Sequence, residues 1–61
     1  MRYLIKYKYR GITREKFVEA ESEEKAKEML KQELLDYYNN YCLQNNITPT
    51  LKNFNKNYKV L

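Results

Sequence analysis

The sequence predicts a small α+β domain in two layers with the order ββα(α)β, in which an antiparallel hairpin or short sheet packs on one long helix. Two patterns carry this prediction. Residues 2–10 alternate between two kinds of side chain before a single glycine, and residues 23–43 repeat apolar side chains at helical spacing. With 61 residues the chain is expected to form one domain, residues 1–61. Such a domain buries only about 60% of its unfolded surface, and many lean on a metal, a disulfide or a partner, so association with itself or with a partner is one way in which this chain could be stabilised.

The hairpin is expected over about residues 2–20. In its first strand, tyrosine and isoleucine point to one side, while the basic residues and Leu4 point to the other. The pair Gly11-Ile12 fits a two-residue type II′ turn, because glycine adopts the positive φ of the first central position. This turn predicts that Ile5 lies opposite Val18, on the face that packs against the helix.

The long helix is expected over about residues 23–43. Ser22 is the predicted N-cap, and Glu23 and Glu24 follow in the first turn, where acidic side chains are favourable. Apolar residues recur three or four positions apart: Ala26, Met29, Leu30, Leu34, Tyr37 or Tyr38, and Tyr41. This stripe predicts an amphipathic helix whose apolar side faces the sheet.

Two shorter elements are expected after the helix. Thr48 offers a cap and Pro49 suits a first helical position, so a short helical turn is predicted over about residues 49–54. Residues 58–61, YKVL, predict a weak final strand.

Most side chains that catalytic and metal sites require are missing. The chain has no histidine, which excludes Ser-His and Cys-His nucleophiles, and its only serine is the predicted cap. Cys42 is the single cysteine, so we expect no disulfide and no zinc site. Its side chain is expected to be a buried or half-buried small apolar group, the alternative being a reactive thiol. The single glycine excludes a glycine-rich phosphate loop. We therefore expect a protein that is not an enzyme and binds no metal or cofactor.

The net charge of +4 is unevenly distributed. Residues 21–36 carry six acidic residues and three lysines, whereas residues 37–61 carry three lysines and no acid. No stretch approaches the roughly 20 apolar residues of a membrane span, and the first ten residues lack the apolar region of a signal peptide. Together with the lone thiol, this favours a cytoplasmic protein without membrane partners.

The first candidate binding surface is the tip of the hairpin. Its members combine aromatic rings with cations: Tyr7, Lys8, Tyr9, Arg10, Arg14 and Lys16. Rings stack on bases and cations hold phosphates, so this surface could bind nucleic acid. The alternative is that cross-strand pairs of tyrosine with arginine or lysine simply cover the end of the core.

The second candidate surface lies near the end of the long helix. Tyr37, Tyr38 and Tyr41 fall within five residues, so they are not all expected to face one small core. Tyrosine is a common anchor of protein interfaces because it buries a large area with few torsions. The alternative is that all three pack under residues 47–54.

The junction between strand and helix carries a resemblance. The stretch FVEAESEEKAKEML ends a strand, caps a helix with Ser-Glu-Glu and continues as an amphipathic helix. It resembles small phage and plasmid accessory proteins, and it is similar to the DNA-binding arm domain of phage-type integrases over about residues 2–35. The integrase arm has three strands before its helix, whereas two are predicted here. The resemblance implies a phage or mobile-element setting, and no functional residue is transferred.

Two functions from different classes follow from these patterns. In the first, the chain binds a host protein or a protein–nucleic acid complex, such as a defence or nucleic-acid-processing complex, and inhibits or modulates it. In the second, it binds DNA or RNA through the hairpin as a small regulator or recombination accessory. The acidic residues offset much of the basic charge, which favours the first. A homodimer formed through a free strand edge is a third hypothesis.

Overall fold

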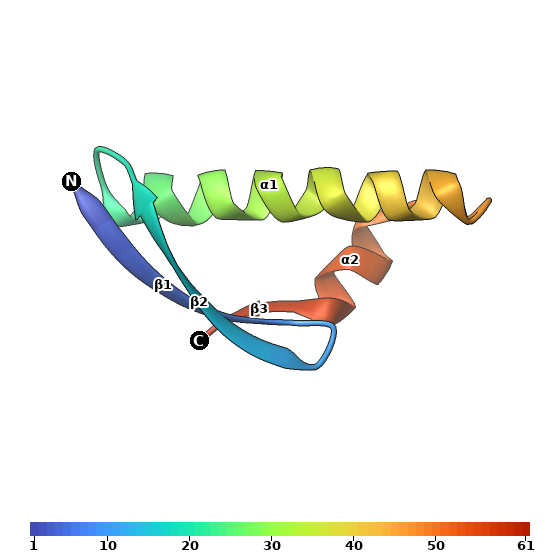
Figure 1. Cartoon of the computed structure of the whole chain (residues 1–61), viewed down its shortest axis with the longest axis horizontal. Coiled ribbons are helices and arrows are strands. Elements are labelled where there is room, and N and C mark those ends of the chain that lie inside the picture. The colour runs from blue at the N-terminus through green and yellow to red at the C-terminus, as the bar shows by residue number, and fades with distance from the viewer.

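The computed structural model describes residues 1–61 and confirms the small α+β fold. The elements are β1 (Arg2–Tyr9), β2 (Ile12–Glu19), α1 (Glu23–Gln44), α2 (Leu51–Asn57) and β3 (Tyr58–Val60). The strands form one antiparallel sheet in the order β2-β1-β3, so the first strand is central. Figure 1 shows α1 along one side of the sheet, with α2 in the wedge where the hairpin diverges from α1.

The hairpin turn lies one residue earlier than the sequence pattern predicted. Its central residues are Arg10 and Gly11, with φ of 52° and 81°, and two positive φ values define a type I′ turn rather than type II′. A residue with a side chain, such as arginine, loses about 1–2 kcal/mol of conformational free energy in this left-handed region of positive φ. The turn nevertheless gains a backbone hydrogen bond to the end of α2, because the Arg10 N–H donates to the Asn57 carbonyl at 2.8 Å. The turn also keeps Ile12 in β2, opposite Tyr9.

The shifted turn changes the pairing but not the faces of the sheet. Ile5 lies opposite Lys16 rather than Val18, and Val18 lies opposite Tyr3. This register differs from the expected one by two residues along β2. Because side chains alternate with a period of two, such a shift leaves every residue on its expected side. Ile5 and Val18 therefore still face α1 and are buried.

Local capping signals set the ends of both helices. The Ser22 hydroxyl accepts a hydrogen bond from the Lys25 N–H at 3.2 Å, as expected for the N-cap of α1. The second helix starts later than predicted, because the Thr50 hydroxyl, not that of Thr48, caps it by accepting from the Asn53 N–H at 3.2 Å. Pro49 therefore lies before the helix. The chain passes directly from α2 into β3, which pairs with the second half of β1.

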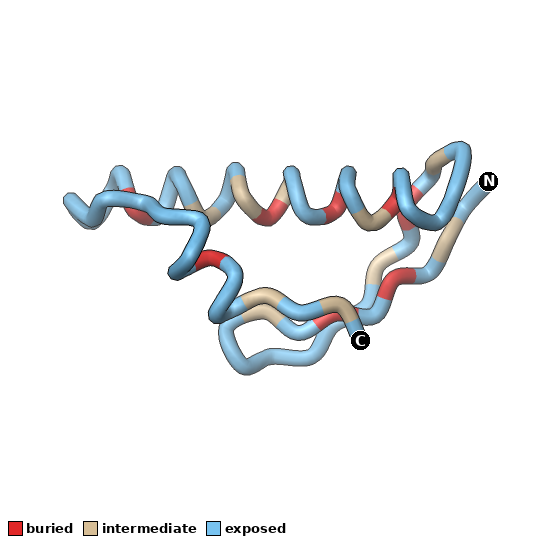
Figure 2. Tube along the Cα trace, turned by 180° about the vertical axis from the view of Figure 1, so that it is seen from behind, coloured by how far each residue is buried: buried red, intermediate tan, exposed pale blue.

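The core is small and becomes aromatic toward the hairpin turn. Its seven clustered residues come from every layer: Ile5, Tyr7, Val18, Ala26, Leu30, Leu34 and Phe54. The buried positions of α1 line its sheet-facing side (Figure 2). Phe54, the buried residue of α2, lies 5.3 Å from Tyr58, 5.8 Å from Tyr38 and 6.1 Å from Tyr9, measured between ring centroids. These rings fix α2 between α1 and the sheet.

We expect Tyr58→Phe to stabilise the fold by roughly 1 kcal/mol in urea denaturation at neutral pH. The Tyr58 hydroxyl is buried without a hydrogen-bond partner. An unsatisfied buried polar group costs about 1–3 kcal/mol, and phenylalanine keeps the ring without it. Tyr37→Phe, which removes an exposed hydroxyl, is the matched control and should leave stability unchanged. A destabilised Tyr58→Phe variant would show that this hydroxyl has a partner.

Tyr58→Phe should also change how the stability of the protein depends on pH in the alkaline range. Burial raises the pKa of Tyr58 above its ordinary value of 10.0. The unfolded phenol therefore ionises at a lower pH than the folded one. The stability that comes from the protonated, folded phenol is complete below the ordinary pKa and is lost as pH rises through the folded pKa. As pH rises from the ordinary value of 10.0 to the folded pKa, stability of the original protein should therefore fall more steeply than stability of Tyr58→Phe. Parallel pH profiles would contradict this.

Candidate functional site

The main concave surface lies between the hairpin and α1. It is a hollow of about 610 Å³, here called the hairpin–helix groove, and three elements contribute to it. Its lining residues are Tyr7 and Tyr9 of β1, Arg10 of the turn, Ile12 and Arg14 of β2, and Leu34, Tyr37 and Tyr41 of α1. The groove therefore joins the two surfaces that the sequence suggested separately.

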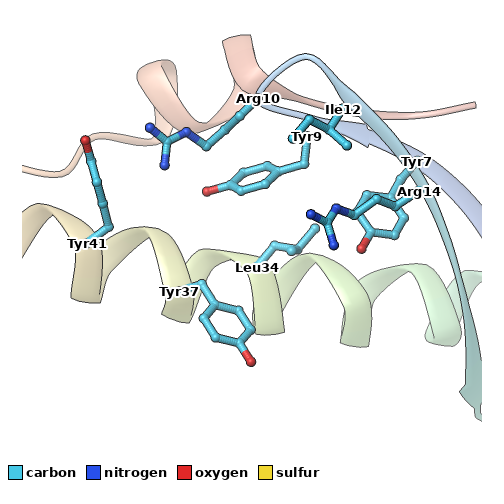
Figure 3. A pocket seen from close by; sticks show the side chains of 8 residues that line it. All are labelled: Tyr7, Tyr9, Arg10, Ile12, Arg14, Leu34, Tyr37 and Tyr41. Carbon is cyan, nitrogen blue, oxygen red and sulfur yellow. The ribbon is translucent and has the colours of Figure 1, made fainter.

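The side chains of the groove are arranged around the hairpin (Figure 3). The Tyr41 ring rises from α1 toward Arg10, whose guanidinium carbon lies 4.5 Å from the centre of that ring. This distance is that of a cation–π contact. The Tyr37 ring turns away from the hairpin and is 64% exposed, so it forms the outer rim of the groove.

The groove is cationic and carries no carboxylate. Neither Arg14 nor Arg10 forms an ion pair. The Arg10 guanidinium contacts the Tyr41 ring instead. Burial raises the pKa of Tyr9, an effect that Arg10 partly offsets, so its hydroxyl stays protonated at neutral pH and can donate a hydrogen bond. The lining thus offers guanidinium and phenol donors beside apolar carbon.

An ion pair joins β2 to α1 outside the groove lining. The Lys16 ammonium donates to both carboxylate oxygens of Glu33 on α1, and both side chains are part-buried. Both residues are neighbours of the groove lining along the chain, because Lys16 lies two residues after Arg14 and Glu33 lies immediately before Leu34. The pair neutralises Lys16, so this predicted site residue joins the sheet to the helix instead of offering a free cation.

The structure separates two further predicted residues from the groove. Lys8 lies on the opposite face of the sheet, because alternation turns it away from Tyr7 and Tyr9. Tyr38 packs on Phe54 and is only part-exposed, so it belongs to the aromatic end of the core. Tyr37 and Tyr41 remain at the groove. Ile12 also lines the groove and was not predicted, because a type II′ turn at Gly11-Ile12 would have placed it in the turn instead of in β2.

The groove also borders a free strand edge. In the order β2-β1-β3, β2 has a neighbour on one side only. Its other edge presents backbone N–H and C=O groups that an extended segment can pair with. Ile12 and Arg14 on β2 line the groove, so the free edge and the aromatic lining lie side by side. This combination suits a ligand with a backbone of its own.

Other chemical features are limited. No group of three or more histidine, cysteine, aspartate or glutamate side chains is placed to hold a metal ion. Cys42 is a free cysteine and is buried. Neither α1 nor α2 combines the length and apolar composition that crossing a membrane requires.

Comparisons of the chain with protein-family models, with curated proteins and with solved structures found no match.

Proposed function

We propose that this chain is a non-enzymatic binding protein that docks an acidic, extended segment of another protein in the hairpin–helix groove. The observation that carries the proposal is the position of this carboxylate-free groove beside the unpaired edge of β2. The edge would add the segment as a strand, and the two arginines would pair with its carboxylates. The tyrosine rings would cover its apolar side chains.

The exposed apolar surface supports a protein as the ligand. Ile12, Tyr37 and Tyr41 are between 41% and 64% exposed and lie around the same groove. Tyrosine and arginine are the residue types that most often dominate the energy of protein interfaces. A nucleic acid would instead require several free cations along a track, and this groove offers only two guanidinium groups.

The proposed effect on the partner is inhibition or modulation by occupancy. The proposed mode of action is not catalytic: the chain would act by covering a surface that the partner needs. The setting we propose is that of a phage or mobile-element protein acting on a host protein, such as a component of a defence or nucleic-acid-processing complex. This setting rests on the small size, the polarised charge and the strand–helix junction of the chain.

Selection of random peptides on the purified protein tests the proposal. We expect the selected peptides to be rich in acidic residues alternating with apolar ones, and to bind with micromolar affinity. Arg14→Glu should weaken their binding by about 30-fold or more, because it places a carboxylate against the acidic ligand. Lys31→Glu is the matched control. This substitution makes the same change of charge, and Lys31 is an exposed residue of α1 without an ion pair.

Mapping the changes in the protein's chemical shifts when a selected peptide is added then locates the site. Shifts should concentrate on β2 and on the Tyr37–Tyr41 side of α1. Peptides without an acidic bias, or binding that Arg14→Glu and Lys31→Glu weaken equally, would contradict the proposed groove.

A further inference from the structure

The face of the sheet that points away from α1 carries a concentrated positive charge. Lys8 of β1 lies directly opposite Lys59 of β3, and both side chains project from this face. Like charges at directly opposite positions destabilise a sheet. The fold therefore places two ammonium groups together where a neutral or acidic partner would be more stable.

Further lysines extend this charge. A hollow of about 290 Å³ is lined by Lys8, Lys56 and Lys59 together with the turn residue Gly11, Asn57 and Tyr58. Lys6 lies two residues before Lys8 on the same face of β1. All four lysines are exposed. We call this cluster of Lys6, Lys8, Lys56 and Lys59 the lysine face.

The lysines of this face form no ion pair within the molecule. None of its four lysines has a carboxylate within ion-pair distance, whereas Lys16, Lys25 and Lys27 each have one within 4.0 Å. The last 25 residues contain no acidic residue, so neither α2 nor β3 supplies a counter-charge. Glu15 on β2 lies opposite Lys6, on the side away from β3, and forms no ion pair with it.

We propose that the lysine face binds the phosphate groups of a double-stranded nucleic acid. Lysine ammonium groups act as point charges that hold phosphates without reading sequence. Tyr58 is the one aromatic residue that lines the hollow, and its ring stacks on Phe54 in the core, so no ring beside Lys8 and Lys59 is free to stack on an unpaired base. Phe17, the exposed ring of this face, lies on β2 opposite Leu4, with Arg2 over it at 4.8 Å. The proposed ligand is therefore a duplex, which presents regularly spaced phosphates, and not a single strand with unpaired bases.

This site lies on the face of the sheet opposite to the hairpin–helix groove. Lys8 projects to one side of β1 while its neighbours Tyr7 and Tyr9 project to the other. A protein segment in the groove and a duplex on the lysine face could consequently be bound at the same time. The chain would then hold its protein partner against nucleic acid.

The number of lysines sets the expected salt dependence. Three or four phosphate contacts predict a slope of roughly −2.7 to −3.6 for the logarithm of the binding constant against the logarithm of salt concentration. Affinity should then fall by roughly 40- to 150-fold between about 50 and about 200 mM salt. The test is fluorescence anisotropy of the purified protein with labelled duplex DNA of about 20 base pairs and arbitrary sequence, and with one of its strands alone.

Substitutions separate the lysine face from the groove. The double variant Lys8→Gln/Lys59→Gln should weaken duplex binding and reduce the slope by about two, one unit for each lost phosphate contact. Its melting temperature should not fall, because the substitution removes a repulsion. Lys31→Gln, the control on α1, and Arg14→Glu, the groove variant, should both retain the slope.

Each alternative outcome overturns the proposal. Absence of duplex binding at the lower salt concentration excludes the site. Single-stranded DNA bound more tightly than duplex would indicate stacking, and loss of binding in Arg14→Glu but not in Lys8→Gln/Lys59→Gln would place nucleic acid in the groove. Peptide binding by the groove is measured separately, so either proposal can fail while the other stands.

Discussion

Phe54→Ala should remove about 3–5 kcal/mol of folding free energy, the range for truncating a fully buried phenylalanine. The Phe54 side chain is 0% exposed and its ring contacts those of Tyr9, Tyr38 and Tyr58. It is also the buried residue through which α2 packs on the rest of the molecule. Its loss should therefore release α2 and β3 together, and reduce the urea midpoint measured by circular dichroism.

Phe17→Ala is the matched control for this prediction. Phe17 is 57% exposed and touches Arg2 through a cation–π contact. Such exposed contacts contribute about 0.5–1 kcal/mol, so the same chemical change should have a much smaller effect. Comparable losses in the two variants would show that Phe54 does not hold α2 in place.

Leu30→Ala should destabilise the protein by about 2–5 kcal/mol. Leu30 is 1% exposed and packs from α1 into the cluster that contains Ile5 and Val18. A domain of this size rarely has more than about 3–5 kcal/mol of stability, so a substantial unfolded fraction is expected at 25 °C. Thermal denaturation followed by circular dichroism measures the loss.

Leu43→Ala, on the same helix, makes the identical chemical change at a position that is 75% exposed. It should change stability by less than about 0.5 kcal/mol. Should Leu43→Ala prove as damaging as Leu30→Ala, α1 would have to bury a different side from the one described here.

The elements with strong periodicity were predictable from the sequence. Alternation over residues 2–10 identified β1, and the three- and four-residue spacing with Ser22 as cap identified α1. Each of these patterns depends on neighbours along the chain. The faces of the hairpin were also correct, because an error of two residues in pairing preserves the side on which a residue lies.

The features that depend on contacts between distant residues were not predictable in the same way. The turn lies at Arg10 and Gly11 partly because the Arg10 N–H bonds to Asn57, which the local sequence does not show. The tyrosines of α1 are divided by Phe54, which draws Tyr38 into the core and leaves Tyr37 and Tyr41 at the groove. The lysine face likewise exists only because β3 pairs with β1.

The candidate site was therefore half predictable. Tyr7, Tyr9, Arg10 and Arg14 were identified by composition, and the structure places all four around one hollow. Composition did not distinguish Lys8, which alternation sends to the other face, or Lys16, which Glu33 neutralises. A side chain is available for binding only after the fold has assigned its neighbours.

The position of β3 has a consequence for the order in which the protein assembles. β1 can pair with β2 through a two-residue turn, but it meets β3 only after almost the whole chain has folded back. Closing so long a loop costs entropy that local contacts do not, and distant strand pairing is slow. Hairpin and α1 should form early, and α2 with β3 should dock late. Lys56 and Lys59 take their places in that last step. The proposed affinity for nucleic acid would therefore be acquired only at the end of folding, after the hairpin–helix groove has largely formed.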